Sequence, residues 1–532
     1  MRPFDTDRRR MLSLMGGMAL FTGFSATRAV AKPVLAKPVF ASNPFSLGVA
    51  AGDPWPDGFV LWTRLAPRPL DEHGGMPMAV VPVTWEVAED DRFARIVKSG
   101  QAMALPELGH SVHAEVTGLQ PGRPYFYRFR TGGSDVSRTG LAKTAPAPGS
   151  IPARLRLGVA GCNNYENGFY TAYRHLGEEA DLDAIFHYGD YIYEGRGAAA
   201  VGQGNNPREL PVRQHAGDEI YSLDDYRRRY AQYKTDADLQ AAHAAAAFII
   251  SFDDHEIDNN WASAYDQDDT APEVFVLRKL SAMQAWYENS PVRLAQFPRP
   301  GGVTAYRRLE FGQLVRMHVL DMRTFRDKQP CRASNLPGCR PATPPETTIM
   351  GQAQEAWLDQ GLANTSRWNL IAQQVLVMPF DSRRAGAAEA DYSDDNWNGY
   401  APARQRLVKS ILDRKLSNVV IATGDAHEDY IGTVPVRDEE PGGPAAAVEF
   451  LATSISSGGD GVVGHAKQDN ARRYNANLRL LNSQRGYHVH EITPDAWHAT
   501  LRVMDKVSTP DGQVSTLARF TVTPDKAELH DA

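Results

Sequence analysis

Side chains that commonly bind metal ions follow four apolar segments of this chain. GCN (161–163) follows one segment, GDYIYE (189–194) the next, DDHE (253–256) a third and GDAH (424–427) a fourth. Thiolate, phenolate, carboxylate and imidazole groups all bind cations, and a glycine ahead of the ligand lets the backbone turn sharply toward an ion. The chemistry that these residue types favour is that of a metal centre.

Taken singly, each motif also has a plain structural interpretation. A lone Cys162 is expected to be a buried core thiol, and a lone Asp or His after a strand is expected to be a loop residue or a helix cap. Several carboxylates buried together are very costly, however, unless cations neutralise them. The four motifs together therefore predict one shared metal site.

The segments that precede these motifs have the composition of buried strands. Apolar runs cover residues 154–162, 183–190, 246–256, 368–378 and 418–428, and helical stretches lie between them at 221–245, 272–289 and 351–363. Buried strands that alternate with helices indicate an α/β layered fold, which we predict for residues 154–525. Ligands bind such sheets at the carboxyl ends of the strands, where all four motifs lie.

Residues 43–147 have a different pattern. Short alternating segments at 59–65, 81–87, 110–116 and 124–130, separated by Gly/Pro turns, predict a small antiparallel β-sandwich domain. VTGLQPGRPYFYRF (116–129) resembles the tyrosine-corner stretch of fibronectin type III domains. TAPAPGSIPA (144–153) is typical of a linker between two domains.

Residues 1–31 have the three parts of an export signal. The basic cluster RRR (8–10) precedes a modest apolar run, and small residues follow, ending in AVA (29–31). RRRML (8–12) resembles the twin-arginine signal, although ordinary secretory signals also place basic residues before an apolar run. We therefore expect a periplasmic or secreted protein, exported by the twin-arginine translocase.

The composition excludes several classes of protein. The chain has 532 residues and a formal net charge of −7, which argues against nucleic-acid binding by bulk charge. No interior stretch reaches the roughly 18 apolar residues of a membrane span. Three cysteines exclude a disulfide scaffold, but Cys331 and Cys339 could form one disulfide in an exported protein.

The order of the four motifs resembles that of the binuclear metallophosphoesterases, and specifically of the PhoD-like alkaline phosphatases. NPFSLGVAAGDPWPDGFVLWTRL (43–65), LATSISSGGDG (451–461) and RGYHVHEIT (485–493) also fit that family. The resemblance implies a calcineurin-like metallophosphoesterase β-sandwich flanked by helices, preceded by a small all-β fibronectin III-like domain. It covers nearly the whole chain after the export signal.

The resemblance also implies a set of metal ligands. Asp190 would bridge two cations, because one carboxylate can give an oxygen to each. Cys162, Tyr193 and His427 would complete the first site, and their anionic donors suit Fe³⁺.

The second implied site consists of carboxylates. Asp190, Asp254 and Asp425 would form it, and an all-carboxylate site suits one or two Ca²⁺ ions better than zinc. Gln373 or Gln374 could add an amide ligand at the end of the 368–378 strand.

Other residues near the motifs are expected to support catalysis. His255 would hydrogen-bond the substrate phosphate or protonate the leaving alkoxide, with a purely structural role as the alternative. Glu256 would orient its loop through backbone contacts, and Asn163 and His187 would surround the ligands. Arg323, with its neighbour Arg326, could clamp phosphate oxygens or pair with acidic residues.

The function expected is metal-assisted hydrolysis of phosphate esters, with a metal-bound hydroxide as the nucleophile. The sequence contains no GxxxxGK[ST] loop and no GxSxG elbow, which argues against nucleotide-driven transfer and against a serine esterase. Three alternatives stay open. They are a phosphodiesterase or phospholipase D that acts on phospholipid or nucleotide diesters, an iron–zinc phosphatase of the purple acid type, and a non-catalytic envelope binding protein.

Overall fold

The computed structural model describes residues 40, 42–197, 211–299, 302–330, 343–363, 365–464 and 466–532. The expected export signal, together with Cys331 and Cys339, lies outside these ranges. Within them, no helix has the length and apolar character needed to cross a membrane.

The largest element is a mixed sheet of ten strands. Its strands β8, β9, β10 and β1 run parallel to one another, and the neighbours on either side are antiparallel. In spatial order the strands are β21 (Lys526–Asp531), β20 (Val514–Thr523), β19 (Trp497–Met504), β18 (Gly486–Ile492), β8 (Leu155–Ala160), β9 (Ala184–His187), β10 (Phe248–Ile250), β1 (Val49–Trp55), β2 (Gly58–Arg64) and β5 (Ser111–Val116).

A second mixed sheet of seven strands faces the first. Its strands β12, β13, β14 and β16 are parallel, whereas β11, β15 and β17 are antiparallel to their neighbours. In spatial order they are β11 (Arg307–Phe311), β12 (Val315–Val319), β13 (Trp368–Ala372), β14 (Val419–Thr423), β16 (Ala445–Leu451), β15 (Asp429–Pro435) and β17 (Leu478–Asn482).

One apolar core fills the space between these two sheets. It joins Val159 and Phe186 of the first sheet with Leu370 and Phe450 of the second, all fully buried. These strands are apolar on both faces because helices cover their outer sides, as expected for parallel strands in layered α/β proteins. The α/β layering predicted from the sequence is therefore present.

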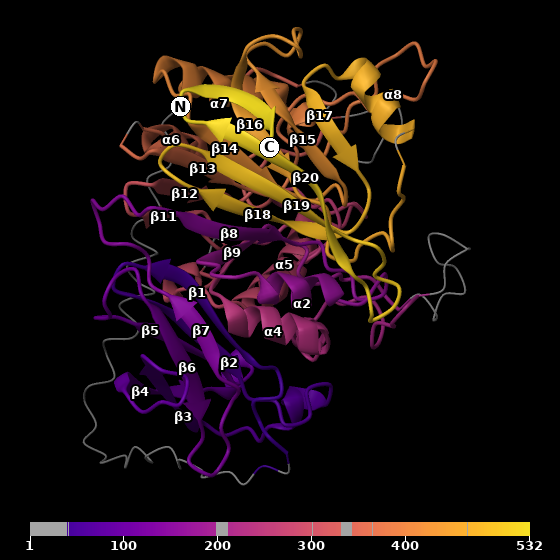
Figure 1. The fold of residues 1–532 in the computed structure, drawn as a ribbon. Helices are drawn as coiled ribbons and strands as arrows, with labels where there is room; N and C mark the ends of the chain where they lie inside the picture. Colours follow the sequence, from indigo (N-terminus) through magenta and orange to yellow (C-terminus); the bar gives the residue numbers. More distant parts are fainter. Residues whose placement is uncertain are drawn as a thin grey trace, which may run out of the picture.

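Helices cover the outer faces of both sheets (Figure 1). The first sheet packs against α2 (Thr171–Glu178), α3 (Leu223–Lys234), α4 (Ala237–Ala245) and α5 (Pro272–Asn289). The second packs against α6 (Gln352–Gly361), α7 (Ala401–Asp413) and α8 (Ala466–Tyr474).

The single helical stretch expected at 221–245 is two helices. α3 ends at Lys234, and α4 begins after Asp236, whose carboxylate accepts hydrogen bonds from the backbone N–H groups of Asp238 and Leu239. An aspartate in this position satisfies N–H groups that have no partner inside the helix. Helix-forming residues lie on both sides of Asp236, and they concealed this helix start.

The N-terminal strands divide between two sheets. β3 (Val81–Ala88), β4 (Ile96–Ala104), β6 (Pro124–Arg130) and β7 (Gly140–Lys143) form a separate four-stranded sheet. β1, β2 and β5 pack over it through a shared apolar core, but they also extend the large sheet, because β1 pairs with β10 in parallel. The sequence analysis did not predict this continuity, since pairing between distant strands leaves no local pattern.

Candidate metal centre

The four motifs occupy the loops that follow β8, β9, β10 and β14. β8, β9 and β10 are parallel neighbours in the large sheet, so their carboxyl ends meet at one edge. β14 brings its own carboxyl end from the facing sheet. Residues that are far apart in the sequence thus come together between the two sheets.

Four of the candidate ligands have a left-handed backbone conformation. The φ angles are 50° at Cys162, 56° at Asp190, 70° at Asp425 and 59° at His427. A non-glycine residue at positive φ is uncommon and costs energy, so such residues cluster where function requires a particular side-chain direction. The turns after the strands aim these four side chains at one place.

Gly189 shows why the loop after β9 needs glycine. Its φ is 139°, a conformation that other residues rarely adopt, and an added Cβ would lie 2.5 Å from the Cβ of Asp253. The loops after β9 and β10 therefore approach each other more closely than any side chain at position 189 would allow.

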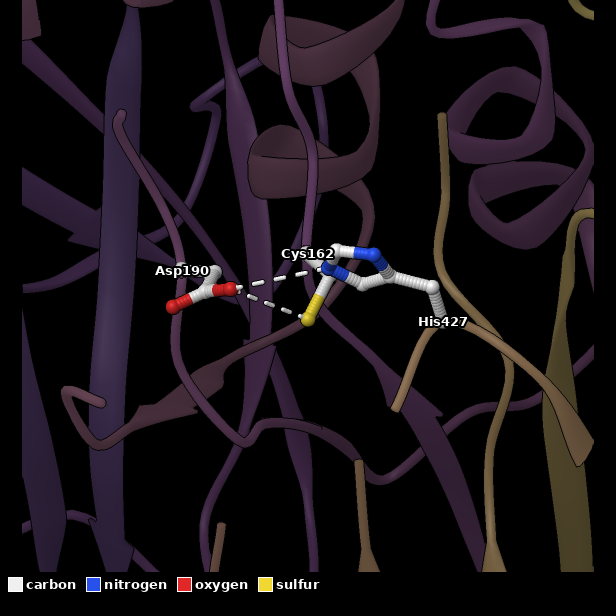
Figure 2. Close-up of side chains that lie close together, drawn as sticks. All are labelled: Cys162, Asp190 and His427. Carbon is white, nitrogen blue, oxygen red and sulfur yellow. Dashed lines mark hydrogen bonds and ion pairs between the residues drawn. The ribbon is translucent and has the colours of Figure 1, made fainter. Parts of the chain in front are cut away.

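The first cluster places a thiol, a phenol and an imidazole around one carboxylate oxygen, and Figure 2 shows three of its members, Cys162, Asp190 and His427. Asp190 Oδ2 lies 3.3 Å from Cys162 Sγ, 2.9 Å from the Tyr193 hydroxyl and 3.9 Å from His427 Nε2. The Tyr193 hydroxyl also lies 3.0 Å from His427 Nε2, and it accepts a 2.6 Å hydrogen bond from Ser457.

A second group of carboxylates shares Asp190 with the first cluster. Potential ligand atoms of Asp190, Asp254 and His255 lie within 4.8 Å of one another, as do those of Asp253, Asp254 and Asp425. Asp190 Oδ1 is buried and accepts no hydrogen bond from any residue that the structure describes. A buried carboxylate oxygen without a donor is costly, so these residues fit a bound cation.

Burial shifts the pKa values of the first cluster in one direction. Desolvation, reinforced by neighbouring anions, raises the pKa of the Cys162 thiol and of the Tyr193 phenol well above their usual values. Desolvation also raises the pKa of Asp190, to about 7. A cation bound here would displace these protons, because thiolate, phenolate and carboxylate are the binding forms.

His427 and Asp254 are held in the forms that suit a ligand. Burial, with the nearby Arg485 guanidinium, lowers the pKa of His427 to about 3, so its imidazole stays neutral. Burial alone would raise the pKa of Asp254, but Arg323 and His255 outweigh it and lower that pKa, so its carboxylate stays ionised.

Arg323 is buried within the carboxylate group. Its Nε donates to Asp253 Oδ1 and its Nη1 donates to Asp395 Oδ2 at 2.8 Å. Its Nη2 lies 3.6 Å from Asp254 Oδ1 and 3.5 Å from Asp425 Oδ1. Of the two roles expected, pairing with acidic residues is the one visible here, and Arg326 likewise donates to Asp395.

His255 pairs with a carboxylate that lies outside both clusters. Its Nδ1 lies 2.7 Å from Glu194 Oε2, and its ring packs against Tyr193 at a tilt of 31°, with ring centres 4.1 Å apart. Burial would lower the pKa of His255, but Glu194 and the carboxylates of Asp254 and Asp190 raise it well above the usual value. These carboxylates therefore favour the protonated imidazole.

Two buried side chains fix the loops relative to each other. The Glu256 carboxylate accepts hydrogen bonds from the backbone N–H groups of Asp190, Tyr191 and Asp253, at 3.1, 2.6 and 2.8 Å. Asn163 donates to the Tyr191 carbonyl at 2.8 Å and accepts from His187 at 2.9 Å.

The candidate amide ligands have other partners. Gln373 hydrogen-bonds the backbone of Val375, and Gln374 donates to Ser251 Oγ at 2.7 Å and accepts from the N–H of Met322 at 3.1 Å. These contacts fix the loop after β13, and a ligand role for Gln373 stays a prediction.

Sequence analysis missed three residues that contact the predicted ones. Asp395 comes from a polar loop, SDDNWN (393–398), and nothing in its composition indicates that Arg323 and Arg326 meet there. Ser457 lies within LATSISSGGDG (451–461), which was noted as a motif without a role, and Glu194 ends GDYIYE (189–194). Only the last two lie in motifs that could have drawn attention to them.

Comparison with known proteins identifies the family. A model of the PhoD-like phosphatases matches residues 157–501, and a model of the N-terminal domain of PhoD-like phosphatases matches residues 29–146. The chain belongs to the PhoD-like phosphatase family. Alkaline phosphatase D of Bacillus subtilis (strain 168) is 41% identical over 526 residues, which cover 98% of this chain and 88% of that relative.

The solved structures give the same result for the fold. "Structure of PhoD" superimposes with a TM-score of 0.86 at 41% identity, and the match covers 93% of each chain. Membership of the PhoD-like phosphatases, together with this degree of identity to an alkaline phosphatase, makes the chain a phosphoric ester hydrolase.

Proposed function

We propose that this PhoD-like phosphatase is an exported enzyme that hydrolyses phosphate esters at a centre of two kinds of cation. Cys162, Asp190, Tyr193 and His427 would hold Fe³⁺, and Asp190, Asp254 and Asp425 would hold one or two Ca²⁺ ions. Thiolate and phenolate suit the first ion and carboxylates suit the second, whereas zinc is less suited to an all-carboxylate site.

One observation carries the proposal. The two oxygens of Asp190 have different surroundings: Oδ2 is surrounded by sulfur, oxygen and nitrogen donors, and Oδ1 is buried with no hydrogen-bond donor among the described residues. A carboxylate that bridges two cations has this arrangement, with one oxygen directed to each.

The cations and the protein side chains would have different roles in the hydrolysis. When bound, the cations supply a water of lowered pKa as the nucleophile and neutralise the phosphate oxygens. His255, oriented by Glu194, holds the proton that the departing alkoxide takes up. Glu256 and Asn163 keep the ligand loops in place during turnover.

The substrates proposed are phosphate monoesters, with phospholipid or nucleotide diesters as the second candidate. Both classes present phosphate oxygens to the same centre, so the shape of the site around it would decide between them. We also infer that residues 154–525 form the metallophosphoesterase sandwich, one sheet of which is extended by β1, β2 and β5, and that residues 43–147 form a fibronectin III-like domain. Residues 1–31 would direct export through the twin-arginine translocase to the periplasm or beyond.

Elemental analysis of the exported protein, combined with esterase assays, tests the proposal. We expect iron and calcium in the wild type, and turnover of a phosphate monoester that is lost with chelator and restored by both metals. Asp190→Asn should lose both kinds of metal and retain less than about 1% of the turnover, since even residues behind the ligands typically affect metal affinity 10–100-fold.

Asp53→Asn is the matched control for that variant. Asp53 is also buried, has a φ of 44° and pairs with Arg307 at 2.7 Å, and it belongs to none of the candidate ligand clusters among the described residues. This control should keep its metals. Wild-type protein that turns over with no bound metal would contradict the proposed centre, and parallel assays with a diester would distinguish the two substrate classes.

A further inference from the structure

Arg485 is a buried cation that bonds to neutral groups beside the candidate metal centre. It lies immediately before β18 and is 3% exposed. Its Nη1 contacts the carbonyl oxygen of His427 at 2.5 Å, Ser454 Oγ at 2.8 Å and the carbonyl oxygen of Ser457, while its Nη2 donates to the carbonyl of Ser483. One guanidinium therefore joins the loops that follow β14, β16 and β17.

The contact with His427 acts on a strained residue. His427 has a φ of 59°, which disfavours any residue with a side chain, and its carbonyl accepts from Arg485. Thr453 Oγ1 lies 3.1 Å from the same carbonyl oxygen and 2.7 Å from that of Gln484. The Arg485 bond opposes rotation of the His427 peptide back to an ordinary conformation. The direction of the imidazole depends on this peptide.

The contact with Ser457 acts on another donor of the same cluster. The Ser457 hydroxyl lies 2.6 Å from the Tyr193 hydroxyl and 2.7 Å from the carbonyl oxygen of Cys162. Because Arg485 holds the backbone of Ser457 as well as that of His427, it links the supports of three of the four candidate ligands.

We propose that Arg485 is a positioning residue, which sets the imidazole of His427 and the phenol of Tyr193 at the spacing that the first cation requires. This inference rests on the proposed metal centre. Lysine could not replace it, because a single ammonium group lacks the planar fork that reaches Ser483 and His427 from two nitrogen atoms.

The test compares metal release from the intact, metal-loaded protein. Arg485→Lys and Arg485→Gln remove the fork, and Thr453→Val removes the hydroxyl that lies between the carbonyls of His427 and Gln484. Arg64→Lys is the control, because Arg64 is 2% exposed and likewise donates to backbone carbonyls, those of Gly109 and Arg227, at a distant place in the fold. Each protein is mixed with excess chelator, and the iron and calcium that remain are measured over time.

We expect both Arg485 variants to release the first cation on the order of 10-fold faster than the wild type, and Thr453→Val to show a smaller increase. The kcat for a phosphate monoester should fall while KM changes little, since Arg485 is 3% exposed and its Nη atoms bond to protein groups. Arg64→Lys should lower the thermal stability of the protein but release metal at the same rate as the wild type.

Two experimental results would overturn the inference, and they differ in whether the proposed metal centre also fails. If the Arg485 variants lose thermal stability as Arg64→Lys does but release metal at the wild-type rate, Arg485 is merely structural and the inference is overturned. If the wild type itself holds no metal, the proposed centre fails first and the inference fails with it.

Discussion

At the scale of single residues, His255 and Glu194 form the pair that we expect to affect turnover most directly. The 2.7 Å contact between them orients the imidazole, and Glu194 and the nearby carboxylates raise the pKa of His255 well above its usual value. A general acid contributes most when the leaving group is a poor one, because a basic alkoxide needs the proton and a stabilised phenolate does not.

Replacing His255 should therefore have an effect that depends on the substrate. We expect His255→Gln to lower kcat for an alkyl phosphate by about 10²–10⁴-fold, and for p-nitrophenyl phosphate by much less. Glu194→Gln should lower kcat for the alkyl ester by roughly 10-fold, since it keeps an acceptor for Nδ1 but loses the charge. Steady-state assays on both esters measure this, and an equal loss on the two would argue that His255 only supports the structure.

At this scale the sequence predicts the candidate ligands that lie in motifs directly after strands. It does not predict contacts between residues that the fold brings together from distant loops. Cys162, Asp190, Asp254 and His427 could be identified because each follows an apolar strand that ends in a recognisable motif. Asp395 could not, because its meeting with Arg323 depends on the course of a long loop that has no periodic pattern.

At the scale of elements, the close approach of the loops after β9 and β10 constrains the site most strictly. Gly189→Ala adds a Cβ that would lie 2.5 Å from Asp253 Cβ, at a φ of 139°. We expect it to reduce the free energy of unfolding by more than about 2 kcal/mol and to abolish turnover, because the clash falls between the ligand loops.

A substitution at a second glycine distinguishes the effect of this clash from the effect of backbone strain alone. Gly149 has a φ of 78°, and an added Cβ there meets nothing within 4 Å. Gly149→Ala should cost on the order of 1 kcal/mol and leave turnover intact. Urea unfolding and monoester assays of both variants check the comparison, and equal losses would show that the approach of Asp253 is not the constraint.

The positions of the strands follow from the local sequence pattern more reliably than the identity of the strands with which they pair. The strands expected at 59–65, 81–87, 110–116 and 124–130 correspond closely to β2, β3, β5 and β6. Their division between two sheets was not predictable, because register and partner are set by contacts across the whole chain.

At the scale of the whole molecule, His113 connects the N-terminal strands to the helical layer. It lies on β5, its ring stacks on Tyr287 of α5, and its Nε2 donates to the carbonyls of Ser290 and Tyr287 at 2.9 and 3.0 Å. Burial lowers the pKa of His113 to about 4. Between pH 6.5 and 4, His113 thus binds a proton in the unfolded chain but not in the folded chain. Acidification therefore favours unfolding.

His113→Gln should remove this dependence while keeping a donor for the carbonyls. Relative to the variant, metal-free wild type should lose on the order of 1–2 kcal/mol of unfolding free energy between pH 7.5 and pH 5. Urea titrations at the two pH values measure the difference. A gap between wild type and variant that stays constant with pH would show that His113 titrates normally in the folded protein.

The parallel pairing of β1 with β10 has a consequence for the order of events during synthesis. β1, β2 and β5 leave the ribosome early, yet β10, which covers the free edge of β1, is complete only when Ile250 has been made. An uncovered edge strand can pair with other chains. The nascent N-terminal half therefore needs protection until the middle of the chain arrives, and neither half can be expected to survive as a separate fragment.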